Sequence, residues 1–208
     1  MQTSSFRIAK IADAADLLSV YAPYVRETAI TFEYDVPCVF EFSGRIRETL
    51  RRFPYLVAER DGKIVGYAYA GAFHPRRAYA WCAEISVYLA REARGAGIGR
   101  SLVAQLEFLM KRQGFCNAYA CVAVPRGEDE FLDTNSLDFH THIGYETIGR
   151  FHRCGCKFGH WYDMVWMEKF LQQGETPAAP VSFSSPDFAG RLEGKTWENG
   201  SELEKFLS

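Results

Sequence analysis

The sequence predicts an α+β domain in which helices flank a mixed, mostly antiparallel sheet. Two tightly joined strand pairs indicate the antiparallel part: 55–59 with 63–71 around the turn dipeptide Asp61-Gly62, and 146–158 with 161–168 around Gly159. A strand–helix–strand run over residues 79–124 predicts one parallel crossover. Sheet and helix faces of this kind pack into a single layered core.

The other elements follow from apolar spacing and from residues that end helices. Apolar and polar residues alternate over 6–11, as in a half-buried strand, and apolar residues at helical spacing follow Asp13, which predicts a first helix there. A second helix is expected over 42–52, because Pro54 prevents its continuation. Apolar residues from Ile98 to Met110 mark one face of a long helix that ends at Gly114. A strand over 115–124 and a short helix over 136–142 complete the set.

The chain divides into residues 1–171, one domain, and residues 172–208, an extension. The extension is rich in proline and serine and has few apolar residues, so a loosely held tail is expected. The alternative is that it packs on the body or on a partner subunit, with Phe183, Phe188 and Trp197 as anchors.

Charge and hydropathy exclude several classes of partner. The formal net charge is -2, and no basic run is present, so neither nucleic acid nor a membrane surface is an expected partner. No stretch of 18 apolar residues occurs. The first residues lack the pattern of a signal peptide, and a cytoplasmic location is therefore expected.

The six cysteines are expected to be free thiols in a reducing compartment. One group invites a metal interpretation, because His152, Cys154 and Cys156 would share one face of a strand, with His160 nearby. It lacks a paired C-x-x-C element, and such matches are often false. We therefore expect no metal.

The most informative segment is the glycine-rich turn Arg94-Gly95-Ala96-Gly97-Ile98-Gly99-Arg100, between a strand and a helix. The first N–H groups of a helix lack intrahelical partners and lie at the positive end of its dipole, which suits phosphate. Arg91, Arg94 and Arg100 add positive charge. The spacing matches neither the dinucleotide-binding fingerprint nor a P-loop. A plain strand-to-helix turn explains one glycine more easily than three.

With this turn the sequence resembles the GNAT superfamily. Arg94, Gly97 and Gly99 match the Arg/Gln-x-x-Gly-x-Gly/Ala signature of that superfamily. The resemblance extends over roughly residues 5–170. Segments 55–59, 66–71, 78–81, 87–88, 140–145 and 155–163 are similar to the phosphinothricin N-acetyltransferase-like branch. The resemblance implies the GNAT (acyl-CoA N-acyltransferase) fold and acetyl-CoA as cosubstrate. It also implies a homodimer with sites near the interface.

The resemblance also assigns cofactor contacts. The diphosphate of acetyl-CoA would lie on the turn, and its pantetheine arm would lie beside the preceding strand, bonded by the backbone of Val87 and Leu89. The family's arm-binding asparagine falls on Asp133 here, which leaves Asn135 as a substitute. The predicted cofactor-binding residues are Val87, Tyr88, Leu89, Arg94, Gly95, Ala96, Gly97, Ile98, Gly99, Arg100, Asn135 and Ser136.

Glu84 is the candidate general base, since an amine must lose a proton before it attacks a thioester. A carboxylate beside Cys82, Ala83 and Ile85 is unusual unless it is paired or functional. The resemblance assigns the base to the same residue. The alternative is an acid paired with a nearby arginine.

His140 is the second catalytic candidate, because the resemblance places it in the slot of the tyrosine that acts as an acid in many GNAT enzymes. Histidine titrates near neutrality and can relay a proton. The alternative is a helix-capping or buried neutral histidine. A thiol with a pKa of about 8.5 is already a fair leaving group, so an acid here adds little.

Phe32, Arg76 and Tyr79 match acceptor-binding positions of the branch. An arginine can bind a carboxylate through two hydrogen bonds, which fits a small amino-acid-like amine such as phosphinothricin or methionine sulfoximine. A solvated loop charge is the alternative for Arg76. Another amine, such as a peptide N-terminus or a polyamine, stays open, as does a non-catalytic acyl-CoA-binding module.

Overall fold

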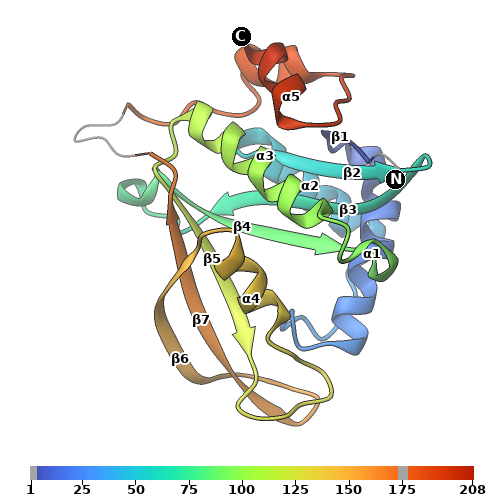
Figure 1. Cartoon of the computed structure of the whole chain (residues 1–208), viewed down its shortest axis with the longest axis vertical. Helices are drawn as coiled ribbons and strands as arrows, with labels where there is room; N and C mark the ends of the chain where they lie inside the picture. Colours follow the sequence, from blue (N-terminus) through green and yellow to red (C-terminus); the bar gives the residue numbers. More distant parts are fainter. Residues whose placement is uncertain (1–3, 173–177) are drawn as a thin grey trace.

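The computed structural model describes residues 4–172 and 178–208 and contains a seven-stranded sheet in the order β1-β2-β3-β4-β5-β7-β6 (Figure 1). The strands are β1 (Ser5–Ile8), β2 (Tyr55–Arg60), β3 (Lys63–Ala72), β4 (Cys82–Leu89), β5 (Asn117–Val124), β6 (Glu146–Lys157) and β7 (His160–Phe170). Neighbouring strands are antiparallel except β4 and β5, which are parallel. The mixed, mostly antiparallel sheet of the sequence prediction is confirmed.

The helices are α1 (Ala14–Glu27), α2 (Val39–Arg52), α3 (Ile98–Gln113), α4 (Asn135–His142) and α5 (Gly200–Leu207). Several boundaries differ from the prediction, and two of the differences have a clear local cause. α2 begins at Val39 because Cys38 caps it, its Sγ accepting the N–H of Glu41 at 3.4 Å. The strand expected from residue 79 begins at Cys82, because Arg77–Tyr79 form a 3-10 turn.

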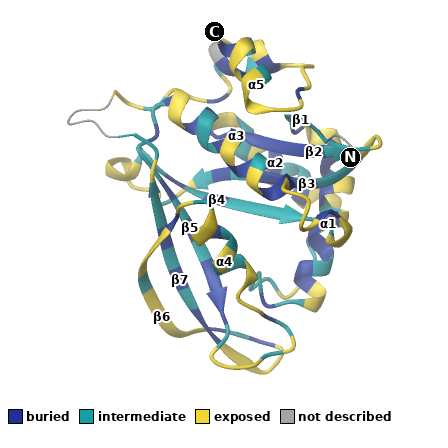
Figure 2. Cartoon of the chain, viewed as in Figure 1, coloured by how far each residue is buried: buried dark blue, intermediate teal, exposed yellow. Residues whose placement is uncertain are grey.

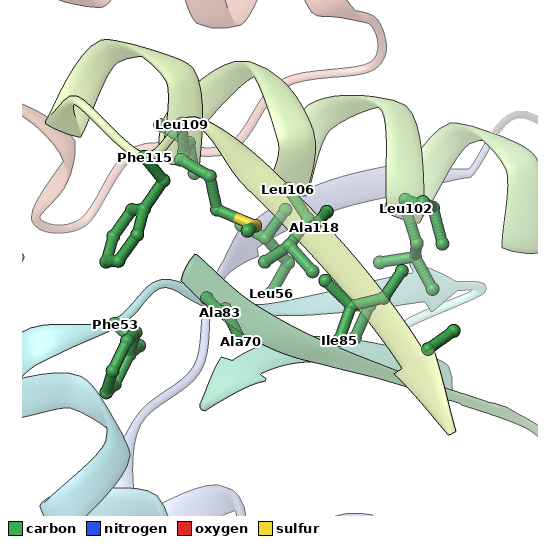
Figure 3. Packing of buried hydrophobic residues seen from close by; sticks show 14 of the residues in the cluster. Phe53, Leu56, Ala70, Ala83, Ile85, Leu102, Leu106, Leu109, Phe115 and Ala118 are labelled. Atoms are coloured by element: carbon green, nitrogen blue, oxygen red, sulfur yellow. The ribbon is translucent and has the colours of Figure 1, made fainter. Parts of the chain in front are cut away.

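The core lies on both faces of the sheet. On one face the leucines of α3 (Leu102, Leu106 and Leu109, all 0% exposed) pack on small residues of the strands (Figure 3). On the other face α1 and α2 cover tyrosines of β2 and β3. Truncating one leucine of α3 to alanine therefore removes about 2–5 kcal/mol of stability.

The parallel pair of the sheet is short, and this positions the site. β4 pairs with β5 only from Cys82 to Glu84, opposite residues 117–119. Beyond Glu84 the two strands separate, as Figure 1 shows, while β5 remains paired with β7 up to Val124. One edge of β4 is therefore open toward the gap from Ile85 onward.

The described part of the extension, residues 178–208, packs on the body instead of hanging loosely. Phe183 and Trp197 are each 1% exposed and Phe188 is 7% exposed, and all three belong to the α3-side core. Trp197 also exchanges backbone hydrogen bonds with Phe6 at the edge of β1. This is the alternative that the sequence left open, with these three residues as anchors. The low apolar content favoured a loose tail, because composition gives little weight to a few large side chains.

No helix in the described residues is long and apolar enough to cross a membrane.

Candidate active site

A cavity of about 390 Å³ lies where β4 separates from β5, next to the glycine-rich turn. It draws its walls from β4, from the turn before α3 and from the start of α4. Predicted cofactor residues that line it are Val87, Leu89, Arg94, Gly95, Gly99, Asn135 and Ser136, together with Tyr24, Ile30, Asp133 and Phe139. These predicted residues lie up to about fifty positions apart in the sequence, and the fold brings them together around one cavity.

Backbone geometry requires glycine at two positions of the turn, and the third glycine is closely packed. Gly95 and Gly97 have φ values of 74° and 79°, the left-handed region that side chains rarely adopt. Gly99 faces the strand and α4, where a Cβ would lie 3.3 Å from Leu89 Cδ1 and 3.4 Å from Phe139. The turn therefore lies close against both walls of the cavity.

The backbone N–H groups of residues 95–100 have no backbone acceptor in the described chain, and the first backbone bond of α3 is from Ser101 N–H to Gly97 O. Gly97 supplies no side chain to cap the helix. These donors meet the requirement for an anion cradle: unpaired amides at a helix start, next to arginines.

Other predicted cofactor residues do not line the cavity. Ile98 is 3% exposed and packs in the core. The Tyr88 ring turns to the opposite face of the sheet, edge-on to Tyr24 at 5.1 Å between ring centroids. Ala96, Gly97 and Arg100 are outside the cavity lining as well, so their contribution would come through backbone N–H groups or charge.

The edge of β4 that faces the gap carries the backbone groups of Val87 and Leu89. Ala90 N–H donates to Val65 O on β3 at 2.9 Å, and hydrogen-bonding direction alternates along a strand. Val87 and Leu89 therefore direct their N–H and C=O away from β3. Tyr24 of α1 binds both groups of Leu89: its hydroxyl donates to the carbonyl at 2.6 Å and accepts from the N–H at 3.1 Å.

At the opposite wall, Asn135 and Asp133 bind each other. The carboxylate of Asp133 accepts hydrogen bonds from the Asn135 backbone N–H at 3.0 Å and from its side-chain amide. The side-chain oxygen of Asn135 keeps its acceptor capacity, and both residues line the cavity.

A smaller cavity of about 50 Å³ continues between β4 and β5 and is lined by Ser86, Cys121 and His140, among others. His140 is 5% exposed, and its Nδ1 lies 2.8 Å from Ser136 O. A carbonyl only accepts, so Nδ1 carries the proton and Nε2 the lone pair. Nε2 is buried without a hydrogen-bond partner, and burial lowers the pKa of the imidazole.

Glu84 occupies the last paired position of β4, directly before the strands separate, and is half-buried. Within the described residues its carboxylate has no ion pair and no hydrogen bond, so the arginine-paired alternative is absent. Burial raises the pKa of Glu84 above its usual range. A carboxylate with these properties is a candidate proton acceptor.

Comparison with known proteins gives the family. A family model described as "Acetyltransferase (GNAT) domain" matches residues 6–166. The phosphinothricin N-acetyltransferase of Alcaligenes faecalis is 37% identical over 175 residues, which cover 82% of this chain and 84% of that protein. The chain belongs to the GNAT acetyltransferase family. It is an acetyl-CoA-dependent N-acetyltransferase, and the resemblance found in the sequence is confirmed.

Two further relatives are similar over most of their length. The crystal structure of a GNAT phosphinothricin acetyltransferase from Sinorhizobium meliloti in complex with AcCoA has a TM-score of 0.77 and 31% identity, over 86% of this chain and 94% of that chain. The L-methionine sulfoximine/L-methionine sulfone acetyltransferase of Pseudomonas paraeruginosa is 31% identical over 183 residues, 86% of this chain and 99% of that protein.

The predicted acceptor residues of this GNAT chain lie at two places. Arg76 and Tyr79 belong to the exposed loop before β4, where the Tyr79 ring lies 5.8 Å from that of Phe73. Phe32 lies in the loop between α1 and α2, and its ring is 6.2 Å from that of Tyr162 on β7. No ring contact joins the two places within the described residues.

The residues considered for a metal do not converge. A bulge between Phe151 and Gly155 breaks the alternation of β6, with Arg153 at a φ of 50°. His152 then binds Asp163, whereas His160 binds Asp129. Among the residues that the structure describes, no group of three or more metal-ligating side chains occurs.

Sequence reasoning missed Tyr24, Ile30 and Cys121, which line the two cavities. Tyr24 lies three positions after Tyr21 on α1, and helical spacing of this kind indicates only a buried face. Burial, with a contribution from the charge of Glu84, raises the pKa of the Cys121 thiol to about 12, so the thiol keeps its proton at neutral pH.

Proposed function

We propose that this enzyme moves the acetyl group of acetyl-CoA to the amino group of a small amino-acid-like substrate of the phosphinothricin or methionine sulfoximine type. The observation that carries the proposal is the unpaired, half-buried carboxylate of Glu84 at the point where β4 and β5 separate. The named activities of the relatives support the acceptor class.

The donor would lie along the open edge of β4. The N–H groups of residues 95–100 would hold its diphosphate, and Val87 and Leu89 would bond its amide-bearing arm as a neighbouring strand does. The arm would share or replace the hydrogen bonds that Tyr24 makes to Leu89. Asn135 and Ser136 would form the facing wall.

Glu84 would take the proton of the acceptor ammonium. The freed amine nitrogen then attacks the thioester carbon, the new C–N bond forms and the C–S bond breaks. The nitrogen gives up its second proton, which the leaving CoA thiolate accepts, so the products are the amide and free CoA thiol. His140, neutral and with its lone pair on Nε2, would accept a hydrogen bond in the gap instead of acting as an acid.

Arg76 would bind the acceptor carboxylate, and Phe32 and Tyr79 would contact its side chain. These residues lie at two separate places in one chain, which fits a site completed by a second copy. We propose a homodimer that covers the β6–β7 hairpin, where Ile148, Phe151, Phe158, Trp161 and Phe170 are 38–61% exposed (Figure 2). Light scattering at micromolar concentration tests it, and a monomer there would contradict it.

The deciding experiment is thiol release from acetyl-CoA with purified protein against amino acids, sulfoximines, polyamines and peptides. We expect turnover with phosphinothricin or methionine sulfoximine to exceed that with polyamines and peptides. Preference for a polyamine or a peptide N-terminus would replace the acceptor class. Binding of acetyl-CoA without turnover on any amine would indicate a non-catalytic acyl-CoA-binding module.

A further inference from the structure

The loop between α1 and α2 is held by three consecutive residues at the end of β6. Lys157 Nζ donates to Thr28 O at 2.8 Å and to Thr31 O at 2.7 Å. One position earlier, Cys156 O accepts a hydrogen bond from the Tyr34 hydroxyl. In Figure 1 the loop leaves the end of α1 on the side of the gap, near α4.

Lys157 is an unusual residue for this place, because its side chain is almost completely buried, at 1% exposure. Lysine is rarely buried unless it is paired, and here both hydrogen-bond acceptors are carbonyls of the loop. Burial lowers the pKa of Lys157, and the nearby charge of Glu33 opposes that effect. The buried ammonium group has these two hydrogen-bond acceptors only while the loop keeps its position, and the loop in turn is held by these two hydrogen bonds.

The third contact is steric. Gly155 lies against the ring of Phe32, so closely that a Cβ at Gly155 would lie 2.2 and 2.4 Å from two ring atoms. Such a separation forces the ring or the loop to move. Glycine at this position is therefore required by the place of Phe32 and not by its own backbone.

The position of this loop matters for the cavities. Ile30 lies between the two carbonyls that Lys157 binds, and it lines both the larger and the smaller cavity in the gap between β4 and β5. A displacement of residues 28–31 would move that wall, and a displacement of Phe32 would move a predicted acceptor contact.

We infer that Lys157 is a positioning residue that fixes Phe32, the proposed acceptor contact, and Ile30, which lines both cavities, through the carbonyls of Thr28 and Thr31. The inference rests on the proposed function for the acceptor role of this wall. Misplacing a substrate-positioning group by about 1 Å can cost on the order of 100-fold in rate. The effect should fall mainly on the acceptor, because the proposed hydrogen bonds to the donor come from β4, the turn before α3 and α4, and the loop adds only the Ile30 side chain to the donor cavity.

The test compares Lys157→Met with Lys169→Met. Lys169 is the matched control, since its Nζ also donates to a loop carbonyl, Ile143 O, at 2.8 Å, but on another part of the sheet. For Lys157→Met we expect faster amide hydrogen exchange over residues 28–34 and at least about tenfold lower kcat/KM for the acceptor. The acetyl-CoA Kd should stay within about twofold. Lys169→Met should leave exchange over 28–34 and the acceptor kcat/KM unchanged.

A second pair keeps the test open if Lys157→Met does not fold. Gly155→Ala should lower acceptor kcat/KM in the parent, yet have little further effect in a Phe32→Ala background, where the clash is gone. Unchanged exchange and kcat/KM in Lys157→Met, equal changes in Lys169→Met, or full additivity in the Gly155–Phe32 cycle would overturn the inference. If the parent shows no turnover, the proposed function is wrong. Hydrogen exchange over residues 28–34 then still tests whether Lys157 holds the loop.

Discussion

The hydroxyl of Tyr24 binds both backbone groups of Leu89, donating to its carbonyl at 2.6 Å and accepting from its N–H at 3.1 Å. A side chain of α1 thus occupies the strand edge on which the pantetheine arm is proposed to lie. The same ring lies under the guanidinium of Arg94, with 5.2 Å between Arg94 Cζ and the ring centroid. Tyr24 therefore connects the open edge of β4 with the turn before α3.

Tyr24→Phe should separate these roles. Without the hydroxyl, both backbone groups of Leu89 lose a partner, and the free energy of unfolding should fall by about 1–2 kcal/mol. Acetyl-CoA can replace the lost hydrogen bonds, so its stabilising shift in Tm should be larger in Tyr24→Phe than in the parent. Thermal unfolding with and without acetyl-CoA measures both quantities. A smaller shift in the variant would mean that the hydroxyl helps to hold the donor instead of standing in for it.

Replacing Glu84 with glutamine should abolish most turnover and leave acetyl-CoA binding intact. General-base catalysis typically contributes about 100-fold or more, so kcat/KM should fall by at least that factor. In the parent, the rate should rise with pH through the raised pKa of Glu84, as the carboxylate loses its proton. That acidic limb should disappear in Glu84→Gln. Glu107→Gln is the control, because Glu107 pairs with Lys169 at 2.7 Å, away from the gap.

The same pKa shift has a consequence for stability. A carboxyl whose pKa is raised in the folded state binds its proton more tightly there than in the unfolded chain. Its contribution to stability is complete below the unfolded pKa and is lost as pH rises through the folded pKa. At pH 7 the ionised carboxylate therefore costs stability, and Glu84→Gln should unfold at a Tm equal to or above that of the parent. A clear loss of stability would indicate that Glu84 is a structural acid.

His140→Phe should reduce kcat by no more than about tenfold, below the typical effect of losing an acid or base. The reason is the hydrogen bond from Nδ1 to Ser136 O, which leaves Nε2 unprotonated and unable to donate to a leaving thiolate. His142 serves as the control, since its Nδ1 makes the same kind of bond, to Asp138 O, but its side chain is exposed. A loss of 100-fold or more would restore the role of an acid, and imidazole 15N shifts would report the tautomer directly.

The elements that sequence predicted well depend on local rules. The hairpin at Asp61-Gly62 is one, since both residues adopt the positive φ that this turn needs. The turn before α3 is another, because Gly95 and Gly97 meet a local backbone requirement, a positive φ. Glu84 also stood out locally, as a charge in apolar company.

What escaped prediction depends on residues far apart in the chain. β4 and β5 separate after Glu84, the last residue of β4 that pairs with β5, and no residue type in the sequence marks that position. Tyr24 reaches Leu89 across 65 positions, and helical spacing shows only that it is buried. The neutral form of His140 likewise follows from its burial in the folded protein, which a sequence pattern cannot give.

The C-terminal extension offers a test of stability without an effect on chemistry. Trp197 is 1% exposed, its Nε1 donates to Gln105 on α3, and its backbone pairs with Phe6 on β1. Trp197→Ala should therefore lower the free energy of unfolding by about 3–5 kcal/mol, the usual cost of such a truncation. The anchors pack on α3 and β1, away from the gap, so kcat/KM of the folded fraction should stay at the parent value.

Phe40, 84% exposed, is the aromatic control, and Phe40→Ala should change stability by no more than about 0.5 kcal/mol. Equal small effects in both variants would show that the extension is loosely held in solution, whereas lower activity of the folded fraction in Trp197→Ala would show that the extension also acts on the site.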